Sequence, residues 1–434
     1  MTPPNRQYCV VGAGAAGLTA ALRLAERGAH VVVVEREPLP GGLAAGFHVD
    51  SGAWLERFYH HIFRSDRASI RLIQELGLAS RLQWLRPSTV TLRDGRLHPL
   101  DSAPSLLRFD PISPLSRLRM GAVLAGLRLL PNPRLLEGHL AASWLERSMG
   151  DQAYNAVWGP LLRGKFGPFA DQVTLPWFWA RVHDRTAELG YLRGGFQQLY
   201  EALCERILLF GGEILFDTSV ELIQSTPQGL EVQMRHAMGV SLETRQFTNV
   251  VSTLATPITC VLAPGLGDAY REAHGRVRSL GAHCLLLSLD RRLTESYWIN
   301  IADPDDPFLA LVEHTNLVPP DDYGGAHLVY LGNYWAHDDP LFGMTADEVL
   351  EAFAPAIRRI NPAFDPSWVR SKWVFSAPNA QPVVDLRFRS AIPPLQTPVR
   401  GLFSANLFQV YPHDRGQNYA ILLGEQVSRL MLEA

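Results

Sequence analysis

One short segment of the sequence constrains the fold more than any other. Residues 7–11 (QYCVV) form a continuous apolar run, which predicts a short buried strand. The segment GAGAAG follows at 12–17, and apolar residues at helical spacing then lead to a second apolar run at 29–34. Parallel strands need a crossover of this kind, usually a helix. The order strand, glycine turn, helix and strand therefore predicts a βαβ unit of a parallel sheet in an α/β protein.

The glycine turn has the spacing of a dinucleotide-binding turn. Gly12 permits the tight turn, Gly14 lets backbone approach a pyrophosphate, and Gly17 lets the helix pack closely on the strand. The helix N-terminus offers free N–H groups to the phosphates. Glu35 ends the second strand and can accept hydrogen bonds from ribose hydroxyls. In this unit the expected cofactor-binding residues are Gly12, Ala13, Gly14, Ala16, Gly17, Glu35 and Arg36.

A second paired-glycine turn lies just beyond the acid, in the sequence GGL at 41–43. It resembles the extended dinucleotide motif of FAD enzymes of the amine oxidase, protoporphyrinogen oxidase and phytoene desaturase superfamily. The resemblance continues in order along the chain, through YLRGGF, EILFDTSVELIQ, NVVST, GLFSAN and GQNYAI. It implies FAD as the cofactor, and it adds cofactor contacts at Gly41, Gly42, Leu43, Val220, Thr253, Asn406 and Asn418.

Two features depart from this family pattern. Members usually carry an acid where this chain has Asn406, although an amide can still bond a ribityl or phosphate oxygen. The sequence also has no convincing equivalent of the lysine that amine oxidases hold near the flavin ring, since Lys372 lies in a strand-like run. Amine oxidation in the narrow sense is therefore not the expected reaction.

The resemblance also implies a domain organisation. We expect an α/β fold in which a Rossmann-type FAD-binding domain, glutathione reductase 2-like, carries an inserted α+β substrate domain. The FAD-binding domain is expected to be discontinuous, and the insert holds most of the tryptophans. The expected ranges are 1–102, 191–275 and 395–434 for the FAD-binding domain, and 103–190 and 276–394 for the substrate domain.

A leucine-rich segment with four arginines, residues 115–136, is predicted to be helical. It is either a membrane-surface element or an ordinary amphipathic helix pair that covers a pocket, and we favour the second interpretation. Peripheral membrane contact nevertheless stays among the expected interactions.

Composition limits the other classes of partner. The net charge of −3 gives no reason to expect nucleic-acid binding. The four cysteines lie far apart without metal-ligand spacing, which predicts buried, reduced thiols and no metal site. The first apolar run reaches the glycine turn too early for a signal peptide. These features favour a cytoplasmic protein, in contact with a membrane at most at its surface.

Segment 50–63 holds several titratable side chains that the resemblance places beside the flavin ring. Histidine exchanges protons near neutral pH, so His60 and His61 are candidate catalytic residues, next to Glu56 and Tyr59. The alternative is that one histidine is a structural donor and that Glu56 pairs with a neighbouring arginine.

Segment 408–419 is a dense polar stretch between the two parts of the C-terminal flavin motif. Such groups are costly to bury without partners, so the segment either lines the flavin pocket, which we favour, or forms a solvated loop. Tyr411 and Arg415 are its candidate catalytic residues. Arg415 could hold an anionic group of the substrate or stabilise the negative charge of the reduced flavin.

Three functions remain open from the sequence. The first is an FAD-dependent oxidase, dehydrogenase or desaturase acting on an apolar small molecule of the isoprenoid, tetrapyrrole or amine kind. No second dinucleotide motif is present, so the expected electron acceptor is oxygen, a quinone or another small molecule. The second is a redox-neutral mutase of a nucleotide sugar, because the sequence from His61 to Phe63 is similar to UDP-galactopyranose mutase. The third is a flavin-binding carrier. The sequence does not fix an oligomeric state.

Overall fold

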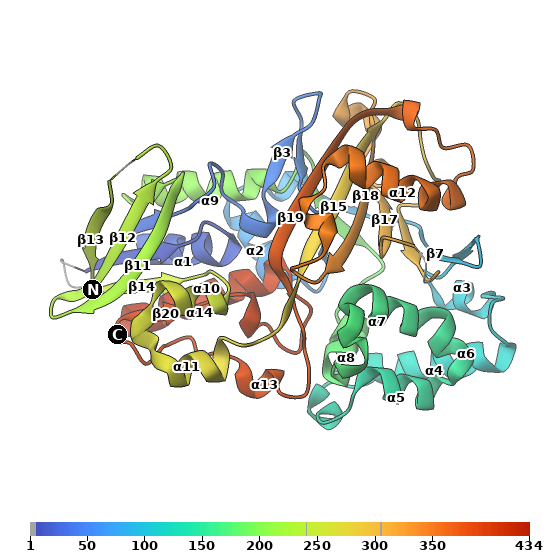
Figure 1. Ribbon diagram of the computed structural model, residues 1–434, viewed down its shortest axis with the longest axis horizontal. Helices are drawn as coiled ribbons and strands as arrows, with labels where there is room; N and C mark the ends of the chain where they lie inside the picture. Colours follow the sequence, from blue (N-terminus) through green and yellow to red (C-terminus); the bar gives the residue numbers. More distant parts are fainter. Residues whose placement is uncertain (1–5, 240, 304–305) are drawn as a thin grey trace.

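The structure is a computed structural model that describes residues 6–239, 241–303 and 306–434 (Figure 1). At its centre lies a five-stranded sheet in which all neighbouring strands are parallel. Valines fill its second strand because a parallel sheet is buried on both faces. The predicted βαβ unit is confirmed. The strands lie in the order β10 (Glu213–Leu215), β2 (His30–Val34), β1 (Gln7–Val11), β14 (Asn249–Ser252) and β20 (Leu402–Ser404).

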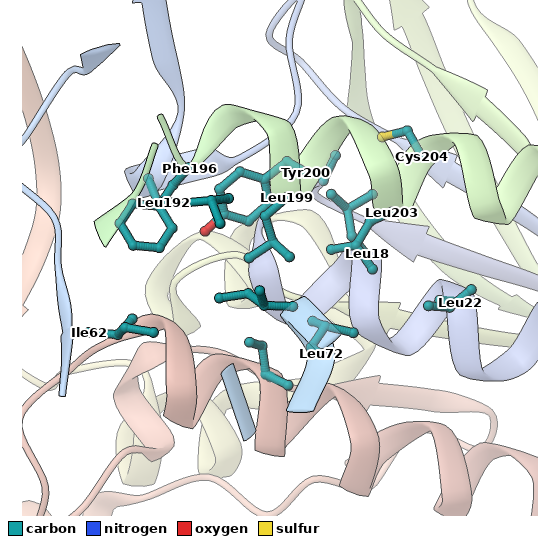
Figure 2. Packing of buried hydrophobic residues seen from close by; sticks show 14 of the residues in the cluster. Leu18, Leu22, Ile62, Leu72, Leu192, Phe196, Leu199, Tyr200, Leu203 and Cys204 are labelled. Atoms are coloured by element: carbon teal, nitrogen blue, oxygen red, sulfur yellow. The ribbon is translucent and has the colours of Figure 1, made fainter. Parts of the chain in front are cut away.

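Helices cover one face of this sheet. The first and last helices approach so closely that a Cβ atom on Gly424 would lie 2.5 Å from the carbonyl oxygen of Ala16. Figure 2 shows leucines of the first helix, among them Leu18 and Leu22, beside Leu199 and Leu203 of a second helix in one apolar cluster. The helices on this face are α1 (Ala15–Ala25), α2 (Arg67–Glu75), α9 (Gln197–Leu209) and α14 (Gln417–Glu433).

A small antiparallel sheet and two short helices cover the opposite face. Their apolar side chains form one cluster with the outward side chains of β1 and β2, such as Cys9 and Val32. The elements are β11 (Thr218–Thr226), β12 (Gly229–His236), β13 (Glu243–Phe247), α10 (Thr256–Leu262) and α11 (Gly267–His274). The sheet is therefore the middle of three layers, as in a Rossmann-type domain.

A second, seven-stranded sheet lies beside the first domain (Figure 1), with α12 (Ala346–Ile360) packed on it. Its last two strands come from residues 89–99, ahead of the expected boundary at residue 102. The strands lie in the order β19 (Val369–Pro382), β15 (Ser279–Leu289), β18 (His327–Trp335), β17 (Ala310–Glu313), β16 (Trp298–Ile301), β7 (Thr89–Arg93) and β8 (Arg96–Pro99).

A helical region forms the end of the molecule away from both termini (Figure 1). The predicted helix over 115–136 is wrong beyond Leu129, because Pro131 and Pro133 cannot donate the hydrogen bonds that a helix needs. The helices are α3 (Ala103–Leu107), α4 (Pro114–Leu129), α5 (Ala141–Met149), α6 (Asp151–Ala153), α7 (Gly159–Phe166) and α8 (Leu175–His183), with α13 (Phe388–Ala391) packed nearby.

Two small sheets connect these parts and carry the segment after the second glycine turn. One pairs β3 (Gly46–His48) with β4 (Trp54–Glu56), and the other has the order β5 (Ile62–Phe63), β9 (Leu189–Leu192) and β6 (Leu82–Leu85). The four cysteines are buried and unpaired, as predicted. Among the described residues, no helix combines the length and apolar character that crossing a membrane requires.

Candidate active site

The carboxyl ends of the five parallel strands bring the expected cofactor-binding residues to one edge of the sheet. Glu35 directly follows β2, Gly12 follows β1, Thr253 follows β14, and Asn406 lies two residues beyond β20. Ligands of open α/β sheets bind at this edge, outside the strand ends. The strand ends therefore define a crevice, which we call the strand-end crevice.

The two glycine turns lie against each other in this crevice. Gly14 and Gly41 form a parallel bridge, and the N–H of Gly41 donates to the carbonyl oxygen of Ala13 at 2.8 Å. A Cβ atom on Gly42 would lie 3.2 Å from the Cα of Gly14, and one on Gly17 would lie 1.9 Å from the carbonyl oxygen of Gly12. Glycine is thus needed at 17 for packing and at 42 for its positive φ of 56° and its close contact with Gly14, whereas at 14 the protein leaves room and the bare backbone faces the crevice.

The N-terminus of α1 lies in the same turn and carries no cap. Its first turn has neither a side-chain hydrogen bond at Gly14 nor an acidic residue. Free N–H groups and the positive end of the helix dipole favour an anion such as a phosphate. The N-terminus of α14, at Gly416, is uncapped in the same way. Both helix ends fit the oxygen-rich groups of a dinucleotide.

Glu35 is fixed at the crevice by backbone groups. Its Oε2 accepts a hydrogen bond from the N–H of Ala13 at 2.6 Å, and its Oε1 accepts one from Glu37 at 2.9 Å. A carboxylate has about four acceptor positions, so two remain for ribose hydroxyls. The neighbouring Arg36 is exposed, with its guanidinium 3.5 Å from Glu37, and Leu43 is also exposed.

Two of the expected cofactor contacts, Thr253 and Asn406, use their side chains to bond other parts of the chain. The hydroxyl of Thr253 donates to the carbonyl oxygen of Val11 at 2.8 Å, which braces the end of β1. Asn406 caps the turn after it, because its Oδ1 accepts from the N–H of Phe408 at 2.9 Å and its amide donates to Ser404 at 3.0 Å. These side chains therefore fix the backbone at the ends of β1 and β20, which border the strand-end crevice.

Asn418 and Val220 likewise have structural surroundings. The Oδ1 of Asn418 accepts from the N–H groups of Ala68 and Ser69, at 2.9 and 3.3 Å, and so caps the N-terminus of α2. Val220 lies in β11 at an irregularity of the β11–β12 pairing and packs with Val34 at the end of β2. For these residues, as for Asn406, contact with a cofactor through the backbone stays a prediction.

Sequence reasoning missed one polar residue at the crevice. Gln417 is buried, its Oε1 accepts from the hydroxyl of Tyr200 at 2.7 Å, and its Nε2 has no partner among the described residues. A buried amide donor without a partner is costly unless a ligand supplies the acceptor. The signal was the polar pair Gln417–Asn418 directly after a glycine and before an apolar helix.

Glu56 joins β4 to the segment that returns the chain to the first sheet. It is buried and accepts from the N–H of Phe196 at 2.6 Å and from the hydroxyl of Tyr191 at 3.0 Å. Burial raises its pKa to about 7, although these hydrogen bonds oppose the shift. The alternative interpretation, in which Glu56 pairs with a neighbouring arginine, is wrong, because Arg57 lies near Glu37 at 3.7 Å and Arg64 pairs with Glu188 at 2.8 Å.

The two histidines after it are neutral at physiological pH. Burial lowers the pKa of His60 to about 4, with a smaller effect of the Arg415 charge, and burial lowers the pKa of His61 to about 3. The Nδ1 of His60 lies 2.6 Å from the carbonyl oxygen of Phe58, whereas the Nδ1 of His61 is buried without a partner. Tyr59 packs edge-on against Trp298, with ring centres 4.9 Å apart.

The structure brings Arg415, but not Tyr411, to this group. The Arg415 guanidinium donates to the carbonyl oxygen of Ala380 at 2.6 Å and to the hydroxyl of Tyr334 at 2.5 Å, and its charge acts on Tyr59 and His60. Tyr411 lies elsewhere, because it packs with the helical region and its hydroxyl donates to Glu137 at 2.9 Å.

Lys165 in α7 also reaches this group, which no sequence motif indicated. It is buried, and its Nζ lies 2.9 Å from the Oδ2 of Asp414 and 5.4 Å from the ring centre of Tyr334. Burial lowers the pKa of Lys165 to about 7 although Asp414 opposes that shift. Lys372, in contrast, pairs with Asp347 at 2.9 Å on the seven-stranded sheet.

Comparison with known proteins relates this chain to flavin-dependent enzymes. Residues 15–408 match the family model described as flavin containing amine oxidoreductase. The chain is 36% identical to 15-cis-phytoene desaturase of Synechococcus elongatus over 84 residues, which is 19% of this chain and 18% of that protein. It therefore spans only about a fifth of that relative's length.

Solved structures extend the similarity to the whole fold. Cyclohexylamine oxidase from Brevibacterium oxydans superposes with a TM-score of 0.74 at 16% identity, covering 99% of each chain. Reduced UDP-galactopyranose mutase superposes with a TM-score of 0.76 at 15% identity, covering 99% of this chain and 96% of that one. The expected fold class is thus confirmed.

Proposed function

The chain belongs to the flavin containing amine oxidoreductase family, and from this premise we propose that it is an FAD-dependent oxidoreductase. The observation that carries the proposal is the strand-end crevice. It combines two bare glycine turns, an uncapped helix N-terminus and a carboxylate, Glu35, anchored for a ribose. Each of these fits one part of FAD.

We assign roles along the crevice in chain order. Backbone at Gly14 and Gly42, with the N-terminus of α1, holds the pyrophosphate, and Glu35 holds the adenosine ribose. Backbone near Val220 borders the adenine. The N-terminus of α14, with the free amide of Gln417, holds the polar edge of the flavin ring system.

Tyr59, His60, His61 and Arg415 form the proposed reaction region. Bound FAD supplies the capacity to accept electrons from a substrate. The neutral histidines offer uncharged imidazole nitrogens, and Arg415 supplies a fixed positive charge held by Tyr334 and Ala380. The aromatic rings of Trp298 and Tyr330 around Tyr59 form an apolar wall that excludes water.

The substrate that suits this wall is an apolar small molecule, oxidised, dehydrogenated or desaturated, with oxygen, a quinone or another small molecule as electron acceptor. The second candidate is a nucleotide-sugar mutase, favoured by the histidine pair directly before Ile62 and Phe63 and by the cations around Asp414. In the domain division we propose, the substrate domain begins before β7, because β7 and β8 belong to the seven-stranded sheet.

The experiment that separates these functions follows the flavin spectrum of the purified protein. Absorbance near the flavin bands supports bound FAD, and bleaching by an added substrate followed by recovery in air supports an oxidase. Binding of a UDP-sugar only after reduction with dithionite supports the mutase. A colourless protein that takes up no FAD on reconstitution contradicts the proposal.

We further propose a cytoplasmic location with peripheral membrane contact through α4. Leu115, Leu118 and Leu129 are 76%, 61% and 81% exposed and share one face of the helix with exposed alanines. Exposed Arg128 flanks this stripe, and an apolar face with basic neighbours suits an anionic lipid surface. Leu118→Glu should reduce sedimentation with phosphatidylglycerol vesicles, whereas Leu209→Glu on α9, 74% exposed, should not. Equal sedimentation of both variants and the unaltered protein contradicts the contact.

A further inference from the structure

Arg185 occupies a position beside the proposed reaction region. It follows α8 in the loop that leads to β9, and its guanidinium lies 5.8 Å from the centre of the Phe63 ring. Its charge contributes to the low pKa of His61, after the larger effect of burial. Burial of the guanidinium and the nearby charge of Arg181 lower the pKa of Arg185 to about 9, although the residue as a whole is exposed, and the charges of Asp414 and Tyr59 also act on it.

The guanidinium of Arg185 has no ion-pair partner and no hydrogen-bond acceptor in the part of the chain that the structure describes. The adjacent carboxylate, Asp184, is engaged elsewhere, because its Oδ2 lies 2.6 Å from the Nδ1 of His413 and accepts from the hydroxyl of Tyr419 at 2.8 Å. The five N–H donors of Arg185 are therefore free for a ligand.

The surroundings of Arg185 carry an excess of positive charge. Lys165, Arg181 and Arg415 all act on a single carboxylate, Asp414, and hold its pKa below the usual range against the effect of burial. Lys165 and Arg181 approach it at 2.9 and 3.6 Å. Asp184 and Asp66 also lie near this region, so four cations face three carboxylates, and Asp184 is already engaged with His413 and Tyr419. We call Lys165, Arg181, Arg185 and Arg415, together with Asp414, the cationic cluster.

We propose that Arg185 binds a carboxylate group of the substrate, and that the cationic cluster attracts that group into the reaction region. This deepens the proposed function and rests on it. The substrate is accordingly an amphipathic acid, with an apolar part against Tyr59 and Trp298 and a carboxylate on Arg185. A planar guanidinium binds a planar carboxylate through two parallel hydrogen bonds, and Arg185 is the arginine of the cluster whose donors are free.

The test measures binding to the FAD-loaded protein by isothermal titration calorimetry. The probes are 2-naphthoate, its uncharged analogue 2-naphthamide, and 2-naphthyl phosphate. The variants are Arg185→Gln and Arg185→Lys, with Arg193→Gln as the matched control because Arg193 pairs with Asp322 at 2.9 Å on the surface. FAD content is measured on each preparation, so that loss of the cofactor is distinguished from loss of the carboxylate contact.

We expect the unaltered protein and Arg193→Gln to bind 2-naphthoate at least about tenfold more tightly than 2-naphthamide. Arg185→Gln should remove that preference without changing FAD content, and Arg185→Lys should keep part of it. Equal affinity for the acid and the amide, or an unchanged preference in Arg185→Gln, overturns the inference. Tighter binding of the phosphate through Arg185 overturns the assignment of a carboxylate.

Discussion

The Nζ of Lys165 lies 2.9 Å from the Oδ2 of Asp414, and this ion pair joins helix α7 to the loop before α14. The side chain of Lys165 is 8% exposed and that of Asp414 is 25% exposed. The pair is therefore shielded from water on the lysine side and partly screened on the other.

Lys165→Met should destabilise the protein by about 1–3 kcal/mol, because it leaves Asp414 with fewer partners in a shielded position. Lys372→Met is the matched control, since Lys372 pairs with an exposed carboxylate, Asp347, and should cost less than about 1 kcal/mol. Urea unfolding of both variants checks this prediction. Equal losses would show that the shielded pair stabilises the protein no more than the surface pair does.

Gly14→Ala should abolish FAD binding and leave the fold intact. The backbone of Gly14 has an ordinary conformation, and the added Cβ would lie 3.9 Å from its nearest neighbour, the Cα of Gly42. The added methyl group should therefore clash with the pyrophosphate of FAD and not with the protein itself. Circular dichroism and FAD content of the purified variant measure the two effects. Gly126→Ala, in an open position on α4, should keep both, and a yellow Gly14→Ala would move the cofactor site elsewhere.

Glu56→Gln should stabilise the protein at pH 8 and leave its stability nearly unchanged at pH 4. The pKa of Glu56 is raised from 4.5 to about 7, so the stability it contributes is present below pH 4.5 and lost as the pH rises through about 7. Glutamine keeps an acceptor for the N–H of Phe196 and stays uncharged. The variant should therefore be more stable than the unaltered protein by about 3 kcal/mol above pH 7. Melting temperatures of both proteins across this pH range test the sign. A difference that does not vary with pH contradicts the prediction.

The Arg415→Ala variant should retain FAD, but its flavin should be reduced about 10²-fold more slowly than in the unaltered protein, because a positive charge beside Tyr59 and His60 is lost. The midpoint potential should become more negative. Stopped-flow reduction by dithionite and a potentiometric titration measure the two quantities. Arg291→Ala removes a guanidinium that pairs with Asp290 on the surface and should change neither. An unshifted potential in Arg415→Ala would place Arg415 outside the active site.

The sequence predicted the parts of the fold that are formed by segments close together in the chain. The pairing of β1 with β2 and the turn from Gly12 to Gly17 join segments that are close in the chain, so their pattern is visible in the sequence. The helix over 115–136 was overextended because leucine spacing hid the effect of Pro131 and Pro133. Residue spacing therefore predicts those elements whose interactions are made between residues close in the chain.

The cationic cluster could not be predicted in the same way. Lys165, Arg185 and Asp414 lie far apart in the sequence and meet only because α7, the loop after α8 and the loop before α14 converge. The alternative pairing of Glu56 with a neighbouring arginine failed for the same reason, because its partners, Tyr191 and Phe196, come from a distant segment. Charge pairing between distant segments follows from topology, which residue spacing does not encode.

The parallel sheet receives its edge strand β20 late in synthesis. Leu402 pairs with Val250, whereas β1 and β2 are already available once the first βαβ unit has left the ribosome. Until β20 arrives, one side of β14 presents unpaired N–H and C=O groups, which another nascent chain can join. Contacts between such distant segments also form slowly. The growing polypeptide therefore exposes an unpaired edge of β14 from the time this strand joins β1 until β20 arrives, and a chaperone that shields β14 would act in that interval.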